Sequence, residues 1–240
     1  MLSDINRFGR LAAIFALIAG PLISLAGMIA TPWEDEATTA SYHDALAAHP
    51  TQAEIAATLL HFGYLLLLPA ALGLMHLSRR ASPKLAHVGG ILAVIGLTTL
   101  PGLLATDLYD LALAQHLPRA QSVEIADAAF SGWAGPLMAM TGMAGMLFGL
   151  VALTAAAWRA GVARGWTPFA VAIGWLAPFV SGTGLVPAVA GVALIALAFG
   201  SIAARVIRMS DQEWAARPAG RIRRRRPTGQ VAGVPAEVRG

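Results

Sequence analysis

The stretch IAATLLHFGYLLLLPAALGLMHLSRR, residues 55–80, decides the fold class of this chain. No charged residue occurs from Ile55 to Ser78, and the stretch ends on Arg79 and Arg80. A helix needs about 20 consecutive apolar residues to cross a bilayer, and basic residues at its end are typical of the cytoplasmic side. The pattern therefore predicts a membrane-spanning helix over residues 55–77.

Five further stretches have the same apolar character. The whole chain is 57% hydrophobic and 12% charged, whereas a soluble domain carries about 25% charged residues. We predict an all-α integral membrane protein, a bundle of six transmembrane helices within residues 1–207. An Arg-rich tail, 208–240, should follow it and be disordered. The predicted spans are 11–30, 55–77, 87–108, 134–158, 166–180 and 185–206.

The basic residues indicate the orientation of this bundle. If successive loops alternate between two sides, all but one of the 17 Lys and Arg residues fall on the same side, and Arg119 is the exception. Cytoplasmic loops retain Lys and Arg, so both chain ends are predicted in the cytoplasm (N-in/C-in). The chain has many Arg and a single Lys, which is typical of high-GC bacteria. We therefore expect a multi-pass protein of the bacterial cytoplasmic (plasma) membrane.

Two longer connections should lie on the outer side. Residues 31–54 are acidic, and 111–132 are expected to hold a short helix. His43 and His49 lie among the acids of the first connection without a fixed metal-ligand spacing. Both are predicted to be solvated loop residues.

Proline and glycine positions predict how the spans bend and pack. Pro21, Pro101 and Pro178 fall inside predicted spans and should interrupt their helices. The pair Gly145 and Gly149 has the spacing that lets two helix backbones approach closely. Packing within the bundle is the favoured interpretation of this pair, ahead of dimerisation.

Four polar residues near the outer ends of the second and third spans form the predicted binding site. His61 and Tyr64 share a face of the second span, and Asp107 and Asp110 share a face of the third. Consecutive antiparallel spans are usually neighbours, so His61 could meet Asp107. An ionisable group in hydrocarbon usually faces a partner or a wet cavity, and a His–carboxylate pair holds a proton near neutral pH. The alternative is that the acids are hydrated and His61 bonds a backbone carbonyl.

The tail carries a run of arginines that should attract anionic lipid headgroups. No aromatic residue interleaves with this run, so nucleic acid is not an expected partner. The lipid-binding residues are predicted to be Arg221, Arg223, Arg224, Arg225 and Arg226.

The motifs of common enzymes do not occur in this sequence. There is no cysteine, phosphate-binding loop, HExxH motif or G-x-S-x-G elbow, so an enzyme is disfavoured and no cofactor or metal is expected. The prediction is a small-molecule or proton-coupled transporter, or a binding protein, with an outward-facing polar pocket. The alternative is a non-catalytic membrane partner or regulatory subunit. A third reading is an intramembrane haem or metal protein, with His76 and His87 as haem ligands. The sequence leaves the oligomeric state open.

Overall fold

The structure, a computed structural model, describes residues 5–180 and 184–216. These residues form helices and no strand, so the all-helical prediction is confirmed for this part of the chain. The helices are α1 (Ile5–Ala30), α2 (Thr39–Ala48), α3 (Pro50–Ser78), α4 (Pro83–Leu104), α5 (Thr106–His116), α6 (Arg119–Phe130), α7 (Ala134–Arg159), α8 (Thr167–Val180), α9 (Leu185–Ile207) and α10 (Asp211–Ala216).

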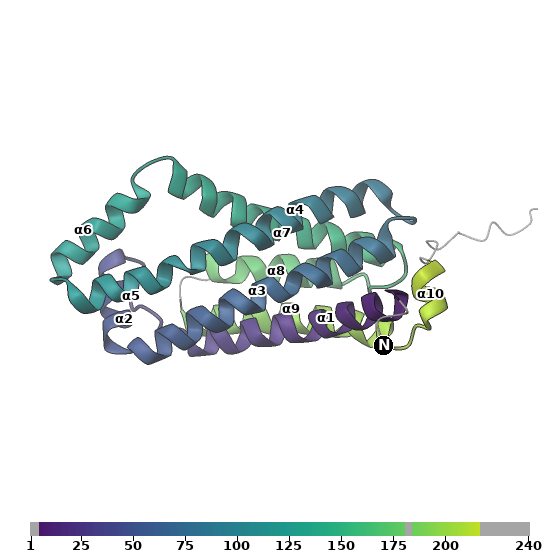
Figure 1. The fold of residues 1–240 in the computed structure, drawn as a ribbon, viewed down its shortest axis with the longest axis horizontal. Helices are drawn as coiled ribbons and strands as arrows, with labels where there is room; N and C mark the ends of the chain where they lie inside the picture. The colour runs from purple at the N-terminus through teal and green to yellow at the C-terminus, as the bar shows by residue number, and fades with distance from the viewer. Residues whose placement is uncertain (1–4, 181–183, 217–240) are drawn as a thin grey trace, which may run out of the picture.

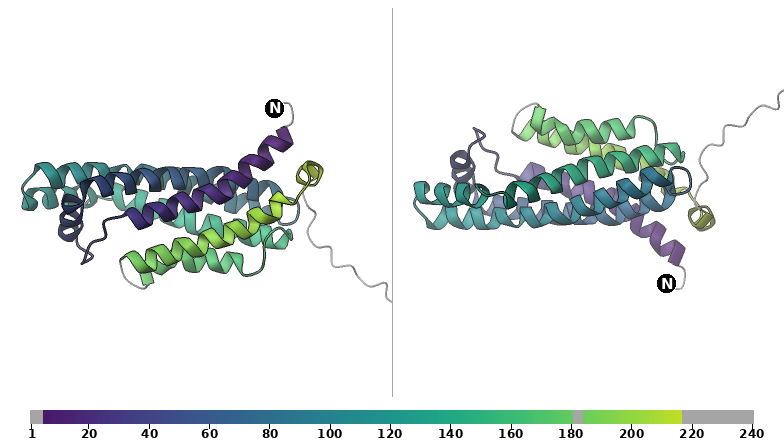
Figure 2. Two further views of the ribbon diagram at one scale, coloured as in Figure 1. Left: turned by 90° about the horizontal axis from the view of Figure 1, so that it is seen from below. Right: turned by 90° about the horizontal axis from the view of Figure 1, so that it is seen from above.

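The long helices lie side by side along one axis (Figure 1). Helices α2, α5 and α6 gather at one end of this bundle, where α5 extends the line of α4 (Figure 1). Helix α10 lies at the opposite end (Figure 2). We call α2, α5, α6 and the connection before α2 the cap, which comprises residues 31–48 and 106–130.

Five helical segments are long and apolar enough to cross a membrane. Helices α4 and α5 together count as one of these segments, Pro83–His116, with 34 residues. The remaining predicted span corresponds to α8, an apolar helix of only 14 residues. At 1.5 Å per residue it is about 21 Å long, less than the hydrocarbon core of about 30 Å.

Helices α4 and α7 approach each other through small residues. A methyl group added at Gly96 would overlap the backbone of Gly145 and Met146, and one added at Gly149 would overlap Ala93. The absence of side chains at these positions therefore sets the distance between the two helices. The predicted close approach at Gly145 and Gly149 is confirmed, and their partner is α4 of the same chain.

The three prolines expected to interrupt helices lie within continuous helices. Pro21 is inside α1 and Pro178 is inside α8. Pro101 is inside α4, which ends three residues later at Leu104. The predicted span 87–108 is thus divided at Ala105, four residues after Pro101. A helix tolerates proline where neighbouring groups satisfy the freed backbone, so the predicted breaks at Pro21 and Pro178 were wrong.

The chain remains folded beyond the predicted start of the tail. Trp214 of α10 is buried, and its ring stacks on His76 with centroids 4.8 Å apart. Arg10 Nε donates to Asp211 Oδ1 at 2.7 Å, which ties α10 to α1. The expectation that disorder begins at 208 is thus corrected for residues 208–216, because an aromatic side chain anchors them. The predicted lipid-binding run, 221–226, lies outside the described residues.

Candidate functional site

The cap is built from short helices with defined ends. The side chain of Thr38 accepts a hydrogen bond from the Ser41 amide at 3.2 Å, which caps the N-terminus of α2. Pro118 precedes α6, so the chain turns between α5 and α6. A small apolar cluster of Leu46, Ala53 and Leu111 joins α2 to α3 and α5. The two connections predicted as outer loops are therefore mostly helical.

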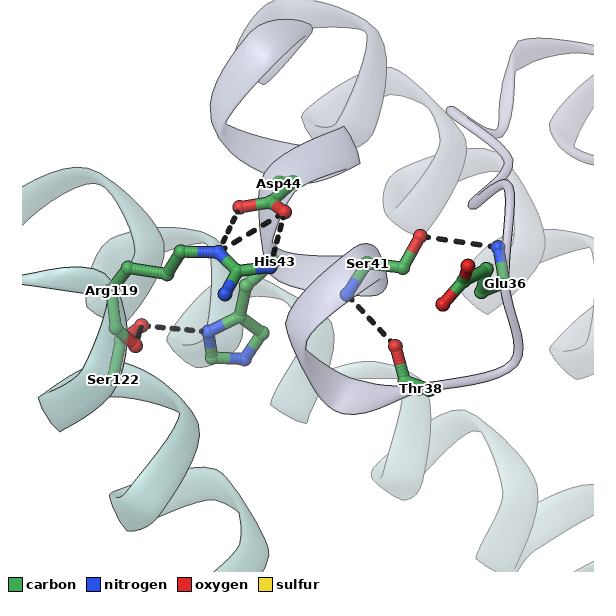
Figure 3. A network of polar contacts seen from close by, with 7 residues as sticks. All are labelled: Glu36, Thr38, Ser41, His43, Asp44, Arg119 and Ser122. Atoms are coloured by element: carbon green, nitrogen blue, oxygen red, sulfur yellow. Dashed lines mark hydrogen bonds and ion pairs between the residues drawn. The ribbon is translucent and has the colours of Figure 1, made fainter.

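Polar contacts hold α2 against α6 (Figure 3). Arg119 Nε donates to Asp44 Oδ1 at 2.8 Å, and Arg119 Nη2 donates to Asp44 Oδ2 at 2.7 Å. This two-pronged contact holds the pKa of Asp44 below its usual range. Thr39 Oγ1 donates to Asp127 Oδ1 at 2.6 Å. The one basic residue predicted on the outer side is thus paired with an acid of the cap.

His43 is the most buried ionisable side chain of the cap, with 2% of its surface exposed. Its Nδ1 lies 3.0 Å from Ser122 Oγ, and Ser122 Oγ donates its own proton to the Arg119 carbonyl. The hydroxyl must therefore accept from His43, so Nδ1 carries the proton. Nε2 has no hydrogen-bond partner among the described residues and lies 3.8 Å from Asp110 Oδ1.

This arrangement gives the His43–Asp110 pair a place for one more proton. In neutral His43 the lone pair of Nε2 faces a carboxylate oxygen, and both groups are acceptors. A proton added to Nε2 changes that contact into an ion pair.

His43 and Asp110 line a cavity of about 490 Å³. This volume is in the range of small-molecule pockets, about 300–1,000 Å³. Burial and the nearby carboxylates of Asp107 and Asp110 raise the pKa of Tyr42, another wall residue. The complete lining is Glu34, Ala37, Thr38, Thr39, Tyr42, His43, Asp110, Ala126, Asp127, Phe130 and Ser131.

His61 lies elsewhere, in a separate hollow of about 260 Å³ beside the junction of α4 and α5. Its Nδ1 donates to the carbonyl oxygen of Pro101 at 3.0 Å. Because α4 ends at Leu104, carbonyls of its last turn lack partners within the helix. His61 donates to one of these carbonyls, which confirms the alternative interpretation that His61 bonds a backbone carbonyl, and it does not pair with Asp107.

The other three predicted residues do not line one cavity, although Asp107 lies between Tyr64 and Asp110 in its electrostatic contacts. Tyr64 is buried beside Trp175 and lines an apolar cavity of about 190 Å³ between the long helices. Asp107 lies near the hydroxyls of both Tyr42 and Tyr64. Only Asp110 lines the large cavity of the cap. The four residues therefore do not line a common cavity.

His43 was predicted to be a solvated loop residue, whereas the structure buries it in the cap. His43 and Leu46 are the two buried residues of α2 and are three positions apart. This spacing puts them on one helix face. The spacing of His43 and Leu46 was therefore a weak indication in the sequence that His43 lies on a buried helix face.

Neither a metal centre nor a pair of haem ligands is evident in the described part of the chain. No group of three or more His, Asp or Glu residues is placed to hold a metal ion there. His76 Nε2 donates to the Trp214 carbonyl at 3.0 Å, and His87 Nδ1 donates to the Pro83 carbonyl at 2.7 Å. One nitrogen of each ring is thus occupied by a backbone contact.

Comparisons of the chain with protein-family models, with curated proteins and with solved structures find no match.

Proposed function

We propose that this is a six-span protein of a bacterial plasma membrane whose cap faces outward and binds a small solute. The cavity of about 490 Å³, with the buried and unpartnered His43 Nε2 in its wall, carries this proposal. Solute binding is the first step both of a binding protein and of a proton-coupled transporter. It is therefore common to the two forms of the function predicted from the sequence.

Exposed apolar side chains support membrane insertion. Along the bundle Phe15 and Ile91 are each 61% exposed, and Phe169 and Leu197 are each 66% exposed. A soluble monomer rarely exposes such contiguous apolar surface, but in a bilayer these side chains contact lipid.

The positions of charged residues support the orientation. Arg79 and Arg80 follow α3 and Lys84 lies near the start of α4, at the end of the bundle that also holds α10. The cap at the other end carries several acids. The positive-inside rule puts the first end in the cytoplasm.

The path of α8 and α9 supports an even number of crossings. Helix α9 packs against α8, and the two run in opposite directions (Figure 1). If both cross, the chain returns to the side from which α1 started. The bilayer would have to thin locally around the short α8, at a cost of fractions of a kcal/mol per Å.

Single-cysteine labelling can test the orientation without a background signal, because the chain has no cysteine of its own. Ser131→Cys lies at the cavity and Lys84→Cys in the first turn of α4, and both positions are exposed. A membrane-impermeant maleimide should label Ser131→Cys in intact cells and Lys84→Cys only after permeabilisation. The reverse pattern would reject the proposed topology.

A thermal-shift screen of the full-length protein in detergent tests solute binding. The screen would use cationic, neutral and anionic metabolites at pH 7.5 and pH 5.5. We expect at least one solute to raise the Tm of the wild type but not that of Asp110→Asn, with a different shift at the two pH values. If every solute that raises the Tm of the wild type raises the Tm of Asp110→Asn by the same amount, the cavity is not the binding site.

A further inference from the structure

The charge of the cap cavity indicates which class of solute it accepts. Its wall contains three carboxylates, Glu34, Asp110 and Asp127, and no Lys or Arg among its lining residues. The nearby cation, Arg119, is already held by both carboxylate oxygens of Asp44. The cavity therefore has a strong negative potential when His43 is neutral.

A second observation concerns a buried histidine in the wall of the cavity. Only 2% of the surface of His43 is exposed, and its Nε2 acceptor lies next to Asp110 Oδ1 without a hydrogen-bond partner among the described residues. A buried acceptor without a donor is costly. An N–H donor or a proton near Asp110 would relieve the repulsion between these two acceptors.

The rest of the lining favours an organic cation over a metal ion. Tyr42 and Phe130 present aromatic rings, and Ala37 and Ala126 present methyl groups. Aromatic faces attract ammonium groups, and apolar surface suits a short carbon chain. The carboxylates come from the connection before α2, from α5 and from α6, and no metal-holding group is found in the described ranges.

We propose that the cap cavity binds a small organic amine, its ammonium groups held by Asp110, Asp127 and Glu34. This inference rests on the proposed function and narrows it to one chemical class.

Three probes with the same four-carbon skeleton test the class of ligand. They are 1,4-diaminobutane, 1,4-butanediol and succinate, measured by isothermal titration calorimetry on the full-length protein at pH 7.5 and constant ionic strength. We expect a measurable heat of binding for the diamine alone. Asp110→Asn and Asp127→Asn should each raise the Kd of the diamine at least tenfold. Asp35→Asn removes the same charge from an exposed residue outside the cavity and should leave the Kd unchanged.

Other outcomes separate this inference from the proposed function. Binding of the diol or succinate that depends on Asp110 would overturn the amine class while keeping the solute pocket. Equal weakening by Asp35→Asn and Asp110→Asn would show only general surface charge and overturn both. Tighter, Asp110-dependent binding of Ca²⁺ or Mg²⁺ would replace the amine with a metal ion. If Asp110→Asn fails to fold, diamine should still slow maleimide labelling of Ser131→Cys, and an unchanged rate would overturn the inference.

Discussion

Replacing Gly96 by alanine should separate α4 from α7. The added methyl group would overlap the backbone of Gly145 and Met146, which cannot rotate away as a side chain could. Alanine favours a helix by about 1 kcal/mol over glycine, whereas overpacking against backbone costs about 3 kcal/mol. The net loss in the free energy of unfolding should be about 2 kcal/mol.

Gly102 offers a matched control in the same helix. It is also a helical glycine, but no atom lies within 4 Å of a methyl group added there. Gly102→Ala should therefore keep or slightly raise the Tm. In detergent, Gly96→Ala should lower it by about 4–8 °C, using about 2–4 °C per kcal/mol for a chain of this size.

The comparison refutes the packing argument if both variants have the same Tm. A fall in Tm for Gly102→Ala alone would also contradict it, because that result would place the close approach at the wrong end of α4. Circular dichroism before heating confirms that each variant still contains its helices.

Acid should loosen the cap, because Arg119 holds the pKa of Asp44 below its usual value. A lowered carboxylate pKa adds stability that is complete above about pH 4 and is lost as the pH falls through the folded value. The difference in hydrogen exchange of α2 between the wild type and Arg119→Gln should thus be large at pH 6 and vanish near pH 2; a constant difference would contradict this. His61→Ala should lower the free energy of unfolding by about 1 kcal/mol, one hydrogen bond to Pro101, without altering solute affinity in the cap. A tenfold loss of affinity would return His61 to the binding site. Trp214→Ala should free α10, so limited trypsin digestion should cut between α9 and α10 sooner than in the wild type, and an equal rate would show that the ring is not the anchor.

Hydropathy predicted the positions of the long helices well. The stretch 134–158 corresponds to α7, Ala134–Arg159, and 185–206 corresponds to α9, Leu185–Ile207. In hydrocarbon every backbone group must bond within its own segment, so the length of an apolar stretch sets the length of a helix. This argument needs no knowledge of the neighbouring segments.

The cap could not be predicted in the same way. Residues 31–48 and 111–130 are polar, and their helices are stabilised by contacts between distant segments, such as the contact of Asp44 with Arg119. His43 is buried only because α5 and α6 cover it. A single sequence does not reveal which polar segments pack together.

The predicted pairing of His61 with Asp107 shows a different limit. Counting residues from the end of a span gives the depth of a side chain, but not the direction in which its helix faces. The early end of α4 also presents a free carbonyl at Pro101, which His61 uses instead. Asp110 lines the cap cavity, and the histidine beside it, His43, comes from a segment that was predicted to be a loop.

The contacts of α1 with α9 and α10 have a consequence for biogenesis. Helix α1 is synthesised long before α9 and α10 but packs against both, so part of its surface stays uncovered until these two helices have been made. In the meantime α1 can pair with α3, its other neighbour. Assembly of the described helices should therefore include a late step in which α9 and α10 dock onto a preassembled hairpin of α1 and α3, and quality-control proteases would act on chains stalled before it.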